Sequence, residues 1–189
     1  SSVYGNPKKI PITENDDRKP INPYAQTKLD GEVLAKKYSE MGVRVIGLRY
    51  FNVFGPRQSK EYAGVIKLFL EKIKQKIPPK INGDGLQTRD FVHIDDVVMA
   101  NILAMDSNIK HEFFNVGTGN SISILDLANV VINASGLSLK PIHGPELSGD
   151  IRASLADTTL IRKLLNWEPK IRLNDWLTKI ISEKDFQDI

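Results

Sequence analysis

The sequence contains no cysteine, and its three histidines, His93, His111 and His143, are scattered along the chain. The absence of cysteine excludes disulfides and thiolate metal sites, and it fits a reducing compartment such as the cytoplasm. The histidines lack the spacing of a ligand set, so no metal site is expected. No apolar run approaches the length of a membrane span, and no segment has the pattern of a signal peptide.

An excess of charge of one sign is also lacking. The 26 Lys and Arg against 23 Asp and Glu give a formal net charge of +3, and the basic pieces, such as EKIKQK, are short. Short pieces of this kind suit solvated helix faces, whereas a nucleic-acid site leaves a basic stripe. We therefore expect neither a nucleic acid nor a membrane as a partner.

A glycine-rich phosphate-binding turn is the third absence. A doubly wound domain that binds a dinucleotide opens with a strand, a glycine-rich turn and a helix. This chain opens with SSVYGNP, without an initiator Met, and runs from a small apolar stretch into a turn. The segment Gly117-Thr118-Gly119 follows an apolar run but has no third glycine at the required offset, so it reads as a turn. We expect the chain to start in mid-domain.

The most informative residues present are Tyr24 and Lys28, in PYAQTKLDGEVLAKKYSEMG. They are four residues apart at the start of a helical pattern, so phenol and ammonium share one face. A cation beside a phenol favours the phenolate and moves it toward the working range of a general acid/base. Such a pair can exchange a proton with an alcohol, although the spacing alone fits a solvated surface lysine equally well. Tyr4 and Lys8 repeat the spacing, but in a turn.

The helix around this pair has clear end signals. Asn22 is a candidate cap, Pro23 follows it at the first turn, and Gly42 supplies a stop. An apolar stripe is expected to pack on the core; it comprises Ala25, Leu29, Val33, Leu34, Tyr38 and Met41.

Helical and extended patterns alternate along the rest of the chain, which predicts an α/β fold. A continuous buried strand is expected over 42–55, a helix over 65–76, and two extended pieces around Gly83-Asp84-Gly85. A helix capped by Asp95 or Asp96 follows; then come a strand over 111–117, a helix ending at Gly136, and a last helix over 158–167.

Taken in order, several segments resemble the extended short-chain dehydrogenase/reductases that act on nucleotide sugars, most closely the NAD-dependent UDP-glucose 4-epimerase type. The segments are SSVYG, YAQTK, LRYFNVFGPRQ, INGDGLQTRDFVHIDDVV, FNVGTG and GDIRASLAD followed by LIRKLLNWEPK. The resemblance implies the C-terminal part of a Rossmann-type doubly wound parallel sheet plus a smaller mixed α/β substrate-binding domain. It assigns residues 1–55 to the NAD-binding domain and 56–189 mainly to the substrate domain, with some segments returning to the sheet.

The same resemblance implies roles for individual residues. Tyr24 would be the catalytic base and Lys28 would bind the nicotinamide ribose, with Phe51 beside the nicotinamide. Substrate contacts would come from Ser2, Tyr24, Asn52, Arg89, Asn115 and Asp150, with Arg89 gripping the diphosphate. The residues alone leave other readings open for several of these: core packing for Phe51, a turn for Asn52 or Asp150, and an ion pair for Arg89 with Asp90 or Asp84. His93 is expected to pack or to make a local hydrogen bond.

Three positions depart from or refine the family pattern. Ser2 occupies a position that is usually Glu in the related 4,6-dehydratases and decarboxylases, which favours an epimerase. Leu147 replaces an arginine that often contacts the diphosphate, a contact that Arg152 could supply. Asn82 replaces an aromatic residue near the base, which weakens apolar contact there. The nucleotide and the sugar therefore stay open.

The expected activity is a transient oxidation at the sugar 4-hydroxyl followed by reduction on the other face, with NAD retained. A sibling dehydratase, decarboxylase or reductase is the alternative enzyme, and a nucleotide-sensing module without activity is the alternative of another class. The complete enzyme is expected to be a cytoplasmic homodimer, and the 189-residue chain alone to be inactive.

Overall fold

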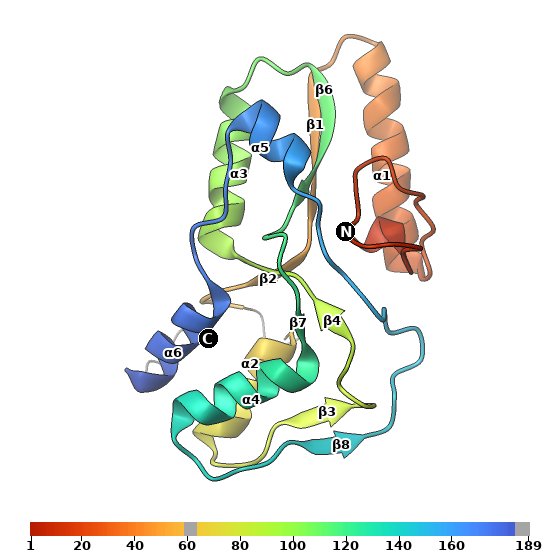
Figure 1. Cartoon of the computed structure of the whole chain (residues 1–189). Coiled ribbons are helices and arrows are strands. Elements are labelled where there is room, and N and C mark those ends of the chain that lie inside the picture. The colour runs from red at the N-terminus through yellow and green to blue at the C-terminus, as the bar shows by residue number, and fades with distance from the viewer. Residues whose placement is uncertain (59–63, 184–189) are drawn as a thin grey trace.

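The structure, a computed structural model, describes residues 1–58 and 64–183 (Figure 1). Helices and strands alternate, so the predicted α/β class is confirmed. No helix within the described ranges is long and apolar enough to cross a membrane. The same ranges hold no group of three or more His, Asp or Glu placed to bind a metal ion.

The helices are α1 Pro23–Glu40, α2 Val65–Lys74, α3 Ile94–Asp106, α4 Ile124–Ser135, α5 Thr159–Leu165 and α6 Leu173–Ser182, with a 3-10 turn η1 at Ser2–Tyr4. The strands are β1 Val45–Tyr50, β2 Asn52–Phe54, β3 Lys80–Asn82, β4 Thr88–Arg89, β5 Phe91–His93, β6 His111–Val116, β7 Ile122–Ser123 and β8 Ile142–Gly144.

One half of the molecule is built on β1 and β6, which run parallel with Leu48 opposite Phe114. Helix α1 lies on one side of this pair and helices α3 and α5 on the other (Figure 1). Its core combines β6, α3, α5 and the segment after α5, and includes Phe114, Val116 and the fully buried Trp167. This layered arrangement is that of a doubly wound parallel sheet.

The other half is smaller in its strands and mixed in their direction. Strands β2 with β5 and β3 with β8 are parallel, whereas β4 with β7 is antiparallel. Helices α2, α4 and α6 pack around a second core that includes Phe69, Leu127 and Leu177 (Figure 1). The predicted mixed α/β part is therefore present.

A third, small core joins the opening segment of the chain to residues that come much later in the sequence. Residues Val3, Tyr4 and Ile12 pack with Phe51 and Ala156. Ile12 donates its N–H to the carbonyl of Leu155 at 2.8 Å and accepts from the N–H of Asp157 at 2.8 Å. The opening segment is thus held as a short parallel bridge against residues far along the sequence.

The prediction of one continuous strand over 42–55 is wrong, because the strand breaks into β1 and β2 at Phe51. The N–H of Phe51 donates to Val116 at 2.9 Å, but the next N–H, that of Asn52, donates to Asp90 at 3.0 Å. The two halves of the run therefore pair with two different strands, and the chain crosses from one half of the molecule to the other at this residue.

The ends of α1 are as predicted. The side chain of Asn22 accepts from the N–H of Ala25 at 2.8 Å, and Gly42 follows the helix with a positive φ of 90°. The predicted apolar stripe is wrong for most of its length, since Val33 is 63% and Met41 69% exposed. The buried residues of α1 are Ala25 and Glu32.

The cap of α3 was assigned to the wrong residue. His93, rather than Asp95 or Asp96, is the cap, and its Nδ1 accepts from the N–H of Asp95 at 3.2 Å. The ring also meets Phe54 edge-on, with centroids 5.1 Å apart, so the predicted packing role of His93 is confirmed. Helix α6 was missed, because Pro169 suggested the end of helical structure.

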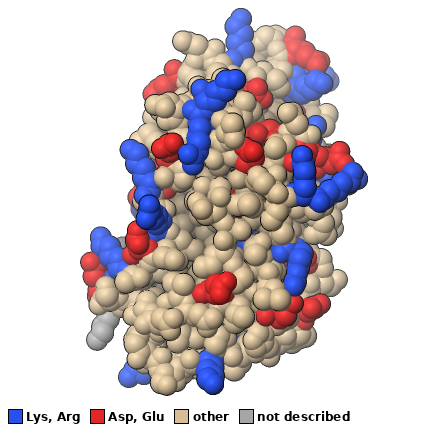
Figure 2. Space-filling model, in the orientation of Figure 1, with Lys and Arg blue, Asp and Glu red and all other residues tan. Residues whose placement is uncertain are grey.

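Charges of both signs are interspersed on the face of the molecule drawn in Figure 2. No broad area of that face carries only Lys and Arg. The picture agrees with the small formal net charge of +3 and offers no basic stripe on this face.

Candidate functional site

A cleft of about 570 Å³ opens between α1, η1 and β1; we call it the α1 cleft. Its lining includes Ser2, Tyr24, Lys28, Glu32, Arg49, Phe51 and Phe113, together with small and apolar residues of β1. The chain forms it by laying α1 across one face of β1 while η1 approaches the carboxyl end of the strand. That end is where ligands of parallel α/β sheets collect.

Tyr24 and Lys28 lie side by side on the cleft face of α1, as their spacing predicts. The Lys28 ammonium is 5.1 Å from the centre of the Tyr24 ring. The ring is 63% exposed, so its hydroxyl is open to a ligand. The pair therefore combines a phenol that can exchange a proton with a cation that can stabilise the phenolate.

Two more predicted residues line the same cleft as this pair. Phe51 is only 4% exposed and lines the α1 cleft from the break between β1 and β2. Ser2 lines the cleft from η1. Sequence positions separated by 49 residues are thus brought to one cavity that has a phenol, a cation, a hydroxyl and an aromatic wall.

Glu32 and Arg49 also line the α1 cleft and were not predicted. Arg49 donates from Nε to Glu32 Oε1 at 2.7 Å and from Nη2 to Oε2 at 2.8 Å. Arg18 adds a third bond to the same carboxylate at 3.0 Å. Burial disfavours the charged form of Glu32, but these guanidinium contacts outweigh it and hold the pKa of the carboxyl below its usual value. One signal was available: an arginine inside an apolar strand needs a buried partner.

On its interior side, Arg49 is linked by hydrogen bonds to Tyr4 and, through Tyr4, to Asn115. Arg49 Nη1 donates to the Tyr4 hydroxyl at 2.7 Å, and that hydroxyl donates to Asn115 Oδ1 at 2.6 Å. Burial raises the pKa of Tyr4 to about 12, although Arg49 opposes the shift. Tyr4 is thus unsuited to proton exchange near neutral pH. Lys8 instead pairs with Asp17 at 3.1 Å, so the expectation that Tyr4 and Lys8 form no functional pair is confirmed.

Asn115 is completely buried within this network. Its amide also donates to the carbonyl of Ile12 at 2.8 Å, and its N–H donates to Glu14 at 2.8 Å. The structure thus gives Asn115 a role in joining β6 to the opening segment, and it does not place the side chain in the α1 cleft. Its predicted contact with a nucleotide stays a prediction.

Arg89 and Asp150 bind each other, so the alternative ion pair of Arg89 is present but with Asp150 in place of the expected Asp90 or Asp84. Arg89 Nη2 donates to Asp150, and Nη1 donates to the carbonyl of Thr88 at 2.8 Å. Asp150 lines a small pocket of about 110 Å³ that also includes Asn82 and Leu147. The two positions that depart from the family pattern therefore lie beside Asp150, in one pocket.

Arg152 lines the same small pocket. It makes two hydrogen bonds to Asp84, from Nη1 and Nη2, each 2.9 Å long. The side-chain hydrogen bonds from Arg152 lower the pKa of Asp84 to about 2. A contact of Arg152 with a ligand phosphate would compete with this pair. Asn52 lies exposed on β2 and lines neither this pocket nor the α1 cleft.

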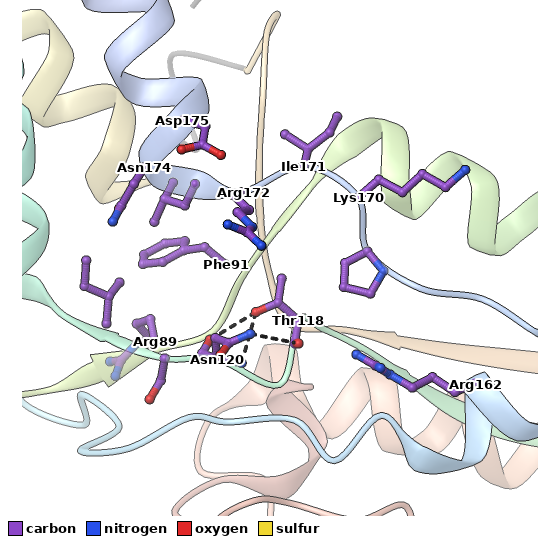
Figure 3. Close-up of a pocket in the computed structure, with 14 residues that line it drawn as sticks. Arg89, Phe91, Thr118, Asn120, Arg162, Lys170, Ile171, Arg172, Asn174 and Asp175 are labelled. Atoms are coloured by element: carbon purple, nitrogen blue, oxygen red, sulfur yellow. Dashed lines mark hydrogen bonds between the residues drawn. The ribbon is translucent and has the colours of Figure 1, made fainter.

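A third cavity, of about 770 Å³, lies between the loop after β6 and the segment that joins α5 to α6 (Figure 3). Its lining carries more cations than carboxylates: Arg89, Arg162, Lys170 and Arg172 against Asp175. The Arg172 side chain points into the space between Phe91 and Thr118 (Figure 3). Apart from Arg89, no predicted site residue contributes to this cavity.

A comparison with protein-family models matches residues 1–117 to the family described as the NAD dependent epimerase/dehydratase family. A UDP-glucose 4-epimerase of Mycolicibacterium smegmatis is 36% identical over 182 residues. The alignment covers 95% of this chain but 58% of the relative, so the chain spans less than two thirds of that protein's length.

Two solved structures have the same fold. A UDP-glucose 4-epimerase of Thermotoga maritima with UDP-glucose matches with a TM-score of 0.91 and 34% identity, covering 98% of this chain and 62% of that one. A UDP-N-acetylglucosamine 4-epimerase of Methanobrevibacter ruminantium in complex with UDP-N-acetylmuramic acid matches with a TM-score of 0.91 and 33% identity, covering 99% and 61%. These two similar structures carry different sugars.

Proposed function

Since the chain belongs to the NAD-dependent epimerase/dehydratase family, we propose that it is part of an enzyme that inverts C4 of a UDP-sugar. One observation carries the proposal: Tyr24 and Lys28 lie together in a cleft that Phe51 closes. The similar 4-epimerases named above support the reaction type and the nucleotide, while the sugar stays open between glucose, its N-acetylamino form and related sugars.

The residues of the α1 cleft fit the nicotinamide ribose end of NAD. Lys28 and Tyr24 offer an ammonium and a hydroxyl for ribose oxygens, and Phe51 offers an apolar wall for the ring. The chemistry that NAD supplies when bound is reversible acceptance of a hydride. We assign residues 1–55 to the cofactor side of the enzyme and 56–189 mainly to the substrate side.

The part played by this chain is proton transfer and orientation. Tyr24, as phenolate, takes the proton of the sugar 4-hydroxyl while the carbon is oxidised, and it returns the proton when the 4-keto sugar is reduced on its other face. Lys28 stabilises the phenolate. Arg89 and Asp150 hold the nucleotide part, so that remote binding keeps the sugar in place between the two steps.

The lining of the α1 cleft favours an epimerase over a dehydratase or decarboxylase. Elimination and decarboxylation call for a further acid/base, usually a carboxylate. Among the described residues that line this cleft, Glu32 is the one carboxylate, and it is bound to Arg49 and Arg18. Ser2 offers a hydroxyl at the position where the sibling enzymes usually carry Glu.

The proposal is tested by product analysis with the complete protein. It is incubated with NAD and, separately, with UDP-glucose, UDP-N-acetylglucosamine and UDP-glucuronic acid, and the sugar is followed by proton NMR. Inversion at C4 of one of these supports the proposal. A dehydrated or decarboxylated product would assign the chain to a sibling enzyme, and NAD-independent nucleotide binding without turnover would make it a sensing module.

We expect residues 1–189 on their own to bind NAD weakly and to show no turnover. The α1 cleft fits the nicotinamide ribose, but the glycine-rich turn that holds the pyrophosphate is not among these residues. Isothermal titration calorimetry of the purified chain with NAD measures this directly. A dissociation constant in the micromolar range would show that the prediction is wrong.

Arg89→Ala in the complete protein should weaken binding of UDP much more than binding of free galactose. A lost charge-assisted contact costs about 1.5–3 kcal/mol, or roughly ten- to a hundredfold in affinity. Arg89→Lys should recover part of this, because an ammonium keeps the charge but not the fork. Titration calorimetry with both ligands measures the difference.

Arg44→Ala is the control, since Arg44 binds backbone carbonyls and lines neither the α1 cleft nor the pocket beside Asp150. Equal losses for both ligands, or no loss, would contradict a diphosphate contact.

A further inference from the structure

Lys28 and Glu32 occupy positions that normally form an ion pair. They are four residues apart on α1, and oppositely charged side chains at this spacing attract each other on a helix surface. Two other side chains at this spacing on α1 do meet, since Gln26 donates a hydrogen bond to Asp30 at 2.8 Å. Lys28, however, makes no ion pair within the residues that the structure describes; its contact is with the Tyr24 ring.

The carboxylate of Glu32 is instead held on the inner side of the helix by the guanidinium of Arg49. The two bonds from Arg49, at 2.7 and 2.8 Å, have the forked geometry that makes arginine–carboxylate pairs strong. Both side chains are nearly buried, with 9% of Glu32 and 5% of Arg49 exposed. Arg49 is fixed in turn by the Tyr4 hydroxyl and by the carbonyl of Glu14.

We propose that Arg49 is a positioning residue, which binds Glu32 and so prevents this carboxylate from pairing with Lys28. The inference rests on the proposed function, because its purpose is to leave the Lys28 ammonium free for Tyr24 and the ligand. Without Arg49, Glu32 would keep only its bond to Arg18, whose side chain is 43% exposed, and its carboxylate could then turn toward Lys28 and neutralise the cation that favours the phenolate.

Few other charges face Lys28 in the α1 cleft. Besides Lys28, the titratable side chains that line it are Tyr24, Glu32, Arg49 and Tyr50. Glu32 is therefore the one carboxylate among these described residues that could bind Lys28.

The first test compares Arg49→Gln with Arg49→Gln/Glu32→Gln in the complete protein. Arg49→Gln should shift the titration of the Tyr24 ring, followed by ¹³C NMR, and the pH–rate profile to higher pH by about one unit, the size of one lost favourable charge at an exposed site. The double variant should return both curves toward those of the wild type. Arg44→Gln, which removes a guanidinium that binds backbone carbonyls and does not line the α1 cleft, should leave both curves in place.

A second pair of variants leaves the buried ion pair intact. Gly31 lies three residues after Lys28, and a Cβ added there meets no atom within 4 Å. Gly31→Glu should offer Lys28 a free carboxylate and reproduce the upward shift, whereas Gly31→Gln adds the same bulk without the charge. The comparison stays informative even if Arg49→Gln does not fold.

The NMR titration needs no turnover, so it separates this proposal from the proposed function. An unchanged Tyr24 titration in folded Arg49→Gln, a double variant that keeps the shift, or identical curves for Gly31→Glu and Gly31→Gln would each overturn the proposal. The proposal is supported if the Tyr24 titration shifts in Arg49→Gln and in Gly31→Glu but not in Arg49→Gln/Glu32→Gln or Gly31→Gln. This result does not depend on which reaction the enzyme catalyses.

Discussion

Tyr24→Phe should lower the turnover of the complete enzyme by about 10²–10⁴-fold, the range for the loss of a general acid/base. The substitution keeps the ring that Lys28 contacts and removes only the oxygen that exchanges the proton. Because the side chain is 63% exposed and makes no packing contact that depends on its hydroxyl, the fold should be unaffected. The measurement is the initial rate at saturating UDP-sugar.

Tyr38→Phe is the matched control, since Tyr38 is on the same helix and is 51% exposed. It should change the rate little. Lys28→Ala should also impair turnover, because the phenolate loses its cation. A Tyr24→Phe enzyme with a rate near that of the wild type would show that the pair on α1 is structural, and the proposed function would fail with it.

Asp90→Asn should lower the free energy of unfolding by about 3–5 kcal/mol, more than any other substitution described above. Asp90 is completely buried and accepts from Thr118 N at 2.8 Å, Thr118 Oγ1 at 2.7 Å, Gly119 N at 3.0 Å and Ala156 N at 3.1 Å. An asparagine amide presents donors to some of these donors, which leaves buried N–H groups without an acceptor.

Thermal unfolding followed by circular dichroism measures this effect, which corresponds to a fall in Tm of roughly 10 °C or more for a domain of this size. Asp126→Asn is the control, because Asp126 bonds Ser123 on the exposed start of α4. Its Tm should change by a few degrees at most. An Asp90→Asn protein that unfolds within 2 °C of the wild type would contradict the four-donor arrangement.

Short sequence signals predicted the helix ends and strands that depend on neighbouring residues in the chain. The cap at Asn22, the positive φ of Gly136 at the end of α4, and the existence of strand β6 follow from side-chain type and spacing. The break at Phe51 was not predictable in this way, because it depends on which distant strands accept the two N–H groups. Pairing partners are a property of the tertiary fold and leave no mark in an apolar run.

The candidate site likewise combines residues that local spacing predicted with residues that only the tertiary fold brings together. Tyr24 and Lys28 were predictable because both are on one helix. Arg89 and Asp150 came from resemblance, and the sequence could not reveal that they bind each other across 61 positions. Glu32 was missed because it resembles an ordinary surface charge, and Arg49 was missed because an arginine in an apolar strand calls for a partner without indicating which residue that is. Only their meeting in the interior gives them a role.

The bridge between Ile12 and the segment around Ala156 also has a consequence for the order of folding. A growing chain emerges from its amino end, so Ile12 has to wait until residues 155–157 have been synthesised before its hydrogen bonds can form. At about 5–20 residues per second this delay is roughly 10–30 s. Tyr4 likewise lacks its acceptor Asn115 until residue 115 has been synthesised. The opening segment therefore reaches its final position late, after residues 155–157 have left the ribosome.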